Sequence, residues 1–193
     1  MERGPVRVAV MADTHGVLRP EVEKIVETCD VIVHAGDFDT QMLYMKLSGK
    51  QPLYAVRGNN DRGWSGGLPG IKRFEIGGVK MVMAHQRTDI PVALGDAQVV
   101  IFGHSHMYQQ QEIAGRLWLN PGSCGRRRFR MELTMAALEL DEDGWQAERV
   151  EIPDETPQKR EKDAPQKCGR RNIEAVLKTM EKGQTVSGID EEL

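Results

Sequence analysis

Five short apolar runs in this chain each end in an aspartate, a histidine or an asparagine, and this repetition limits the folds that the chain can adopt. The runs are VRVAVMAD (6–13), VIVHAGD (31–37), PLYAVRGN (52–59), VKMVMAH (79–85) and VVIFGHSH (99–106). Runs of this length and valine content are typical of buried strands and are too short for ordinary helices. The sequence therefore predicts a buried sheet structure with polar side chains at several strand ends.

Two amphipathic segments separate the first three runs and predict helices. Residues 19–29 have a proline near their start, and residues 40–49 have Asp39 or Thr40 as candidate N-cap and a glycine at their end. Strands that alternate with helices indicate right-handed parallel crossovers. A hairpin follows over residues 71–85, and further strand-like runs continue to residue 152. We therefore predict an α/β (α+β) fold of two sheet layers flanked by helices.

Composition narrows the class of protein and its compartment. The chain has 193 residues, of which 39% are hydrophobic and 28% charged, with a formal net charge of −3. These values predict a soluble globular protein and argue against nucleic acid or an acidic membrane as its partner. Three cysteines without C-x-x-C spacing, and no signal peptide or membrane-spanning run, predict a cytoplasmic location.

The composition changes near residue 152, which predicts two parts. Residues 1–152 form the main domain, and residues 153–193 form a charged, proline-containing linker with a short amphipathic helix. The apolar residues of this helix lie at i, i+3, i+4 and i+7, between Ile173 and Met180. Docking of this helix on its own domain is the favoured interpretation. A homo-oligomer or a partner bound through the same face is the alternative.

The side chains at the strand ends are expected to meet. In sheets with parallel strands, ligands bind in the crevice beyond the carboxyl ends of the strands. Residues two apart in an extended chain point the same way, so we expect Asp13 to converge with His15, and His104 with His106. One polar strand end has an ordinary explanation, such as a helix cap or a turn. Five such ends in one chain favour a shared site.

The polar blocks together resemble a known family. DTHG (13–16), GD (36–37), GNND (58–61), His85 and GHSH (103–106) are similar, in order and spacing, to the five blocks of the calcineurin-like metallophosphoesterase superfamily. NPGS (120–123) resembles the small prokaryotic phosphodiesterase branch. The resemblance implies a four-layer α/β/β/α sandwich of two mixed sheets, with a metal site at the carboxyl ends of the strands.

The same resemblance implies two divalent metal ions and a ligand set. The first ion would be held by Asp13, His15, Asp37 and His106. The second would be held by Asp37, Asn59, His85 and His104, so that Asp37 bridges. A hydroxide held between the metals would attack a small phosphate ester, with nucleotides among the candidate substrates. The family favours manganese, and nitrogen and oxygen donors also suit iron, nickel, cobalt and zinc.

One departure from the family pattern affects the expected activity. Asn60 stands where relatives carry a histidine or cysteine, and an amide cannot donate a proton to a leaving group at neutral pH. Diesters and esters with acidic leaving groups are therefore expected to be better substrates than alkyl monoesters. Asn60 and Asp61 are the candidate catalytic residues, although Asp61 is expected to hydrogen-bond within the site. Asn60 and Arg126, from the RRRFR run, are candidate substrate contacts.

Two residues outside these blocks carry further expectations. We expect His34 to be a buried, hydrogen-bonded side chain that supports the loop carrying Asp37. Trp64 could stack on a substrate ring or simply pack against the domain. The competing function is a scaffold similar to a eukaryotic retromer subunit with a vestigial metal site. Competent residues at all seven ligand positions favour the enzyme.

Overall fold

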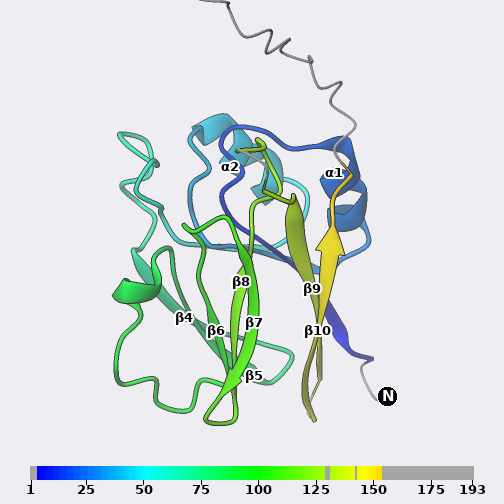
Figure 1. Cartoon of the computed structure of the whole chain (residues 1–193), viewed down its shortest axis with the longest axis vertical. Coiled ribbons are helices and arrows are strands. Elements are labelled where there is room, and N and C mark those ends of the chain that lie inside the picture. Colours follow the sequence, from blue (N-terminus) through cyan, green and yellow to red (C-terminus); the bar gives the residue numbers. More distant parts are fainter. Residues whose placement is uncertain (1–3, 129–130, 142, 154–193) are drawn as a thin grey trace, which may run out of the picture. The chain divides into compact units, whose positions relative to one another are not determined.

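The computed structural model describes residues 4–128, 131–141 and 143–153. Within these residues the chain forms two β-sheets, two α-helices and one 3-10 helix (Figure 1). In chain order the elements are β1 (Val6–Met11), α1 (Pro20–Glu27), β2 (Val31–His34), α2 (Gln41–Ser48), β3 (Leu53–Ala55), β4 (Ile71–Ile76), β5 (Val79–Ala84), η1 (Arg87–Asp89), β6 (Val99–Ile101), β7 (Tyr108–Ile113), β8 (Arg116–Pro121), β9 (Thr134–Asp141) and β10 (Gly144–Glu151).

The first sheet has the strand order β10-β9-β1-β2-β3. The strands β1, β2 and β3 are parallel, and the helices α1 and α2 connect them, as the alternation in the sequence predicts. Strand β9 pairs antiparallel with β1 and continues into β10 through a hairpin. Thr40 caps α2, since its hydroxyl accepts a hydrogen bond from the backbone N–H of Leu43.

The second sheet has the order β4-β5-β6-β8-β7. Strands β4 and β5 form the predicted hairpin, which turns at Gly77 and Gly78 with φ of 58° and 83°. Such left-handed angles at both turn positions suit glycine, which has no side chain to clash with the backbone. Strands β5, β6 and β8 are parallel, so both sheets are mixed.

The largest apolar cluster lies between the two sheets. It is formed by the side chains on the inward faces of the strands, which alternate with side chains on the outward faces. In β1, Val8 and Val10 pack with Met81 and Leu117 of the second sheet, and all four are almost fully buried. The intervening residues of β1 face the other way, toward α1 and α2. Strand β1 is thus buried on both faces, as its apolar run predicted.

The outer faces of the two sheets are covered differently. Helices α1 and α2 bury Val22, Val26, Leu43 and Leu47 on the first sheet. On the second sheet, the loop of residues 86–98 with the short η1 takes the place of a helix. Figure 1 shows the strands of the second sheet gathered to one side of the β9–β10 hairpin. The predicted architecture of two mixed, flanked sheets is confirmed, with a loop as one of its outer layers.

The predicted division of the chain at residue 152 stays a prediction. All but the first residue of the 153–193 segment, including Cys168 and the amphipathic helix, lies outside the described residues. Cys29 and Cys124 are buried free thiols. Among the described residues, none of the helices has the length and apolar character needed to cross a membrane.

The inter-sheet core leads to a stability prediction. Replacing the fully buried Leu138 by alanine removes packing between the sheets. The free energy of unfolding should fall by about 2–5 kcal/mol, measured by urea denaturation. Met45→Ala, at a methionine of α2 that is 62% exposed, is the matched control and should change it by no more than about 0.5 kcal/mol. Equal effects of the two substitutions would contradict this account of the core.

Candidate metal centre

Loops at the carboxyl ends of five strands deliver the candidate ligands to one place. The loops after β1, β2 and β3 come from the first sheet, and those after β5 and β6 come from the second. Direct contacts join the two sheets here: the backbone N–H of His104 donates to Asp13 Oδ2 at 2.8 Å, and His85 Nε2 lies 3.0 Å from Asn59 Oδ1. The sequence-predicted side chains therefore lie together, as the crevice rule for parallel strands requires.

The backbone at these positions differs from the expected extended chain. Five of the seven candidate ligands have left-handed φ angles: Asp13 at 53°, His15 at 45°, Asp37 at 60°, His104 at 70° and His106 at 58°. The extended backbone behind the expected i, i+2 convergence is therefore absent at these residues, although Asp13 and His15 do converge. Left-handed backbone costs on the order of 1 kcal/mol per residue and concentrates at functional sites, where surrounding contacts hold it.

The first group of ligand atoms consists of Asp13, His15 and His106. His15 Nε2 and His106 Nε2 are 3.2 Å apart, and they lie 3.9 and 3.4 Å from Asp13 Oδ1. All three residues are buried. Burial and the neighbouring His15 lower the pKa of His106 to about 4, so its imidazole is neutral at pH 7. These donors have the spacing and chemistry of a metal site.

The second group consists of Asn59, His85 and His104. Asn59 Oδ1 lies 3.0 Å from both His85 Nε2 and His104 Nδ1, so these three side chains meet at one oxygen. His104 and His106 therefore belong to different groups, which corrects the expectation that they converge on one point. The separation matches the division of ligands that the family resemblance implies.

Asp37 lies between the two groups. Its Oδ2 is 3.9 Å from His15 Nε2 and 3.5 Å from His85 Nε2. Burial alone would raise the pKa of Asp37, but the nearby His85 and hydrogen bonds from Asn60 outweigh burial and hold the pKa below its ordinary value. Asp37 therefore presents a carboxylate to both groups, which is the position expected of a bridging ligand.

The pKa of Asp13 is shifted in the opposite direction to that of Asp37. The surroundings of Asp13 also show whether a cation fits the first group. Burial raises the pKa of Asp13 to about 7, and its Oδ1 has no hydrogen-bond partner among the described residues. The buried Nδ1 of His106 also has no hydrogen-bond partner among these residues. Unpartnered buried polar atoms are costly, and a divalent cation bound to the carboxylate would satisfy one of them. The residues present therefore fit the metal ions that the motifs imply.

Asp61 is a positioning residue rather than a proton donor. Its carboxylate accepts hydrogen bonds from the backbone N–H groups of Asp37, Asp39 and Gly58, all between 2.8 and 2.9 Å. The carboxylate of Asp61 thus holds the loops after β2 and β3 together, in agreement with the expected hydrogen bonding within the site.

The candidate substrate contacts are placed differently. The Asn60 side chain donates from Nδ2 to Asp37 Oδ2 at 2.6 Å, so its amide orients the carboxylate between the two groups. Arg126 is exposed. Arg128, two residues later in the same basic run, has Nη2 3.4 Å from His15 Nδ1 and so lies beside the centre.

Sequence reasoning considered Asp39 only as a helix cap and missed its contact with the site. Both oxygens of its carboxylate lie 3.0 Å from His15 Nδ1. The only local signal was a second acidic residue two positions after Asp37. The contact spans 24 residues, and no periodicity in the sequence reports on it.

Two residues outside the motif blocks lie close by. His34 is fully buried, accepts a hydrogen bond from the N–H of Gly36 at Nδ1, and has Nε2 3.0 Å from Thr14 Oγ1. His34 therefore supports the start of the Asp37 loop as expected, and burial lowers its pKa to about 3. Trp64 packs against Phe38 and Tyr44 in the helix-side core, the apolar cluster between the first sheet and helices α1 and α2. This position favours a packing role over stacking on a substrate.

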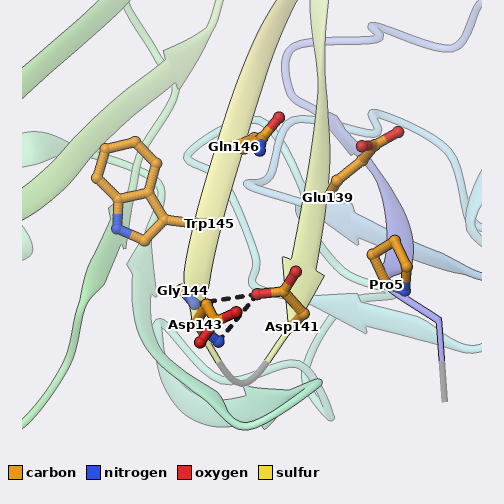
Figure 2. Close-up of a pocket in the computed structure, with 7 residues that line it drawn as sticks. All are labelled: Pro5, Glu139, Asp141, Asp143, Gly144, Trp145 and Gln146. Carbon is orange, nitrogen blue, oxygen red and sulfur yellow. Dashed lines mark hydrogen bonds between the residues drawn. The ribbon is translucent and has the colours of Figure 1, made fainter. Parts of the chain in front are cut away.

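A hollow on the surface lies away from the candidate metal centre. It has a volume of about 290 Å³ and is lined by residues of the β9–β10 turn, together with Pro5 and Glu139 (Figure 2). The N–H groups of Asp143 and Gly144 donate to Asp141 Oδ1 there. The hollow sits at the amino-terminal end of β1, because the end of β9 pairs with Val6. It therefore lies at the opposite end of the first sheet from the candidate metal centre.

Comparison with known proteins agrees with these observations. A family model described as a calcineurin-like phosphoesterase superfamily domain matches residues 6–143. A protein of Bacillus subtilis named a probable metallophosphoesterase is 29% identical over 153 residues, covering 72% of this chain and 86% of that protein. A protein of Methanocaldococcus jannaschii named a phosphodiesterase is 25% identical over 141 residues, covering 62% of this chain and 84% of that protein.

Solved structures share the fold. An archaeal protein described as a novel phosphodiesterase matches with a TM-score of 0.63 and 23% identity, over 76% of this chain and 99% of that one. Vps29 of Entamoeba histolytica matches with a TM-score of 0.60 and 21% identity, over 76% of this chain and 99% of that one. At these identities, the likeness shows the fold alone.

The tight approach of the two loops leads to a prediction. A Cβ added to Gly58 would lie 2.1 Å from Asp37 Oδ1 and 2.4 Å from Asp37 N, so Gly58→Ala must displace the Asp37 loop. We expect Mn²⁺ affinity to fall at least about tenfold and stability by about 1–3 kcal/mol, measured by calorimetric titration and denaturation. Gly67→Ala, with nothing within 4 Å of its Cβ, is the control. Unchanged Mn²⁺ affinity in Gly58→Ala would count against Asp37 as a ligand.

Proposed function

Since the chain belongs to the calcineurin-like phosphoesterase superfamily and is a phosphoric ester hydrolase of that kind, we propose that it is a dinuclear metal phosphodiesterase. Its substrates are small phosphate diesters, with nucleotides as a candidate class. The proposal rests on one observation, the convergence of two groups of nitrogen and oxygen donors with Asp37 between them.

The proposed ligand sets divide the donors as the contacts do. Asp13, His15 and His106, with Asp37, hold one cation. Asn59, His85 and His104, with Asp37, hold the other. In addition, Asp13, Asp37 and His85 lie close enough to share an ion, which supports two cations at neighbouring positions.

The charge of the centre supports an anionic substrate. Two divalent cations bring a charge of +4, and the charged ligands Asp13 and Asp37 bring −2, while histidine and asparagine ligands are neutral. The centre therefore keeps a positive charge that a phosphate ester can neutralise. When bound, a pair of divalent cations lowers the pKa of a water toward neutrality and draws charge from the phosphate oxygens. Asp37 and Asn60 hold the geometry for this chemistry.

Manganese is the proposed metal, with iron, cobalt, nickel and zinc as alternatives. Imidazole, carboxylate and amide donors suit all of these ions. Thiolate does not enter the proposed sets, because the thiols of Cys29 and Cys124 are buried in the helix-side core. Burial raises the pKa of Cys124 to about 12, so this thiol stays protonated.

Arg128 is the proposed substrate contact from the basic run, in place of the expected Arg126. Its guanidinium lies next to His15 at the edge of the first group and is exposed to solvent. The planar fork of an arginine can bind two oxygens of a phosphate at once. Arg128 would therefore add a positively charged group on the His15 side of the centre, where it could bind the phosphate of an incoming ester.

The central test is metal-dependent hydrolysis of bis(p-nitrophenyl) phosphate. We expect turnover with Mn²⁺, loss of turnover after chelation, and at least about a 100-fold lower kcat/KM in Asp37→Asn, because this substitution removes the negative charge that lies between the two groups. Asp96→Asn, at an exposed carboxylate paired with Lys80, is the control and should retain activity. Circular dichroism should show that both variants are folded.

The competing function, a scaffold similar to Vps29 with a vestigial metal site, makes the opposite prediction. A folded, Mn²⁺-saturated protein with no hydrolysis of any diester or monoester in a substrate panel would favour the scaffold. The competence of all seven ligand positions, together with their convergence, favours the enzyme.

Asn60 should control the preference between diesters and monoesters. A histidine at this position could protonate a leaving alkoxide, which matters most for alkyl monoesters. We expect Asn60→His to raise the ratio of monoester to diester turnover by about tenfold or more, measured with paired p-nitrophenyl and alkyl substrates. Asn60→Ala separates this effect from loss of the hydrogen bond to Asp37, and it should lower both activities together. An unchanged ratio in Asn60→His would contradict the assigned preference.

A further inference from the structure

The loop after β2 supplies more than the carboxylate of Asp37. Asp39, two residues later, places both carboxylate oxygens 3.0 Å from His15 Nδ1. A carboxylate can only accept a hydrogen bond, and its two contacts of 3.0 Å are shorter than the 3.4 Å contact between the same nitrogen and Nη2 of Arg128. These distances favour a proton on Nδ1. The other nitrogen, Nε2, then holds the lone pair of the neutral ring, and it faces Asp13 and Asp37 at 3.9 Å.

We propose that Asp39 is a positioning residue that fixes the tautomer and ring orientation of His15, so that Nε2 is the nitrogen offered to a metal ion. The inference rests on the proposed function, because it assigns a role within the same metal centre. Partners of this kind set the geometry and the basicity of a histidine ligand. Asp39 itself contacts neither metal ion nor substrate in this assignment.

The backbone around Asp39 supports a dedicated role. The ordinary role of an aspartate before a helix is capping, but Thr40 caps α2 here. Asp39 has a left-handed φ of 64°, a conformation that is costly for a residue with a side chain. Its N–H donates to Asp61 Oδ1 at 2.9 Å, so the conformation is held by the same carboxylate that holds Asp37. In this conformation the carboxylate of Asp39 points toward His15 Nδ1.

The other histidines of the centre provide a comparison. His85 has its Nδ1 2.7 Å from the carbonyl oxygen of Ala35, so a neutral backbone group orients that ring. His106 has no partner for Nδ1 among the described residues. His15 is oriented instead by the carboxylate of Asp39, which is 36% exposed. A carboxylate partner makes Nε2 of His15 a more basic metal ligand than a carbonyl partner would. The first metal position should therefore depend on Asp39 more than the second.

The test measures Mn²⁺ binding to the full chain by calorimetric titration. We expect Asp39→Ala to weaken the site containing His15 by about 10- to 100-fold, whereas Asp39→Asn, whose amide oxygen can still accept from Nδ1–H, should weaken it by less than about tenfold. Thr40→Ala is the matched control: it removes the adjacent helix cap, so it should lower thermal stability without weakening Mn²⁺ binding.

Nitrogen NMR of the His15 ring gives a readout that needs neither metal nor activity. The wild type and Asp39→Asn should show a protonated Nδ1, and Asp39→Ala should show a mixture of tautomers or the Nε2–H form. Wild-type Mn²⁺ affinity in Asp39→Ala, equal losses in Asp39→Ala and Asp39→Asn, or an unchanged tautomer would each overturn the role of Asp39. Absence of binding of Mn²⁺ and of the alternative ions of iron, cobalt, nickel and zinc in the wild type would instead overturn the proposed function, and this inference with it.

Discussion

The buried carboxylate of Asp61 is the interaction on which the geometry of the centre depends. By accepting the N–H groups of Asp37, Asp39 and Gly58, it joins two loops that follow different strands of the first sheet. Hydrogen bonds to a charged acceptor are stronger than those between neutral groups. Left-handed backbone at Asp37 and Asp39 can persist because these bonds over-determine it. The positions of Asp37, which lies between the two ligand groups, and of Asp39, which contacts His15, are thus both set by one side chain.

The centre buries two carboxyl groups close together, and bound cations would balance their negative charge. Asp13 and Asp37 are buried close together, and burial pushes the pKa of Asp13 up while His85 and Asn60 hold that of Asp37 down. Two neighbouring carboxylates with opposite shifts need positive charge nearby before both can be ionised. Beside them the imidazole of His106 is neutral at pH 7, because burial and the neighbouring His15 lower its pKa to about 4. The protein therefore provides the lone pairs, and the divalent ions of the family provide the charge.

Much of the fold was predictable because it follows from local pattern. The length and valine content of the apolar runs at residues 6–13 and 99–106 identified strands, and Gly77 with Gly78 identified a hairpin turn. The polar strand ends also indicated which side chains meet. Contacts such as Asp39 with His15 could not be predicted, since they depend on how loops 24 residues apart turn in space. For the same reason the sequence-based choice of Arg126 as the substrate contact could not anticipate that Arg128 lies beside the centre.

Separation along the chain gives the centre a role in folding. His15 and His106 face each other across 91 residues, and Asp13 meets the backbone of His104 across the same span. Closing such long loops is entropically costly, so these contacts cannot form until both sheets have docked. A cation that binds only the docked state would stabilise it by mass action. Metal supply would then govern how much of the newly made chain reaches its native state, in addition to any effect on turnover.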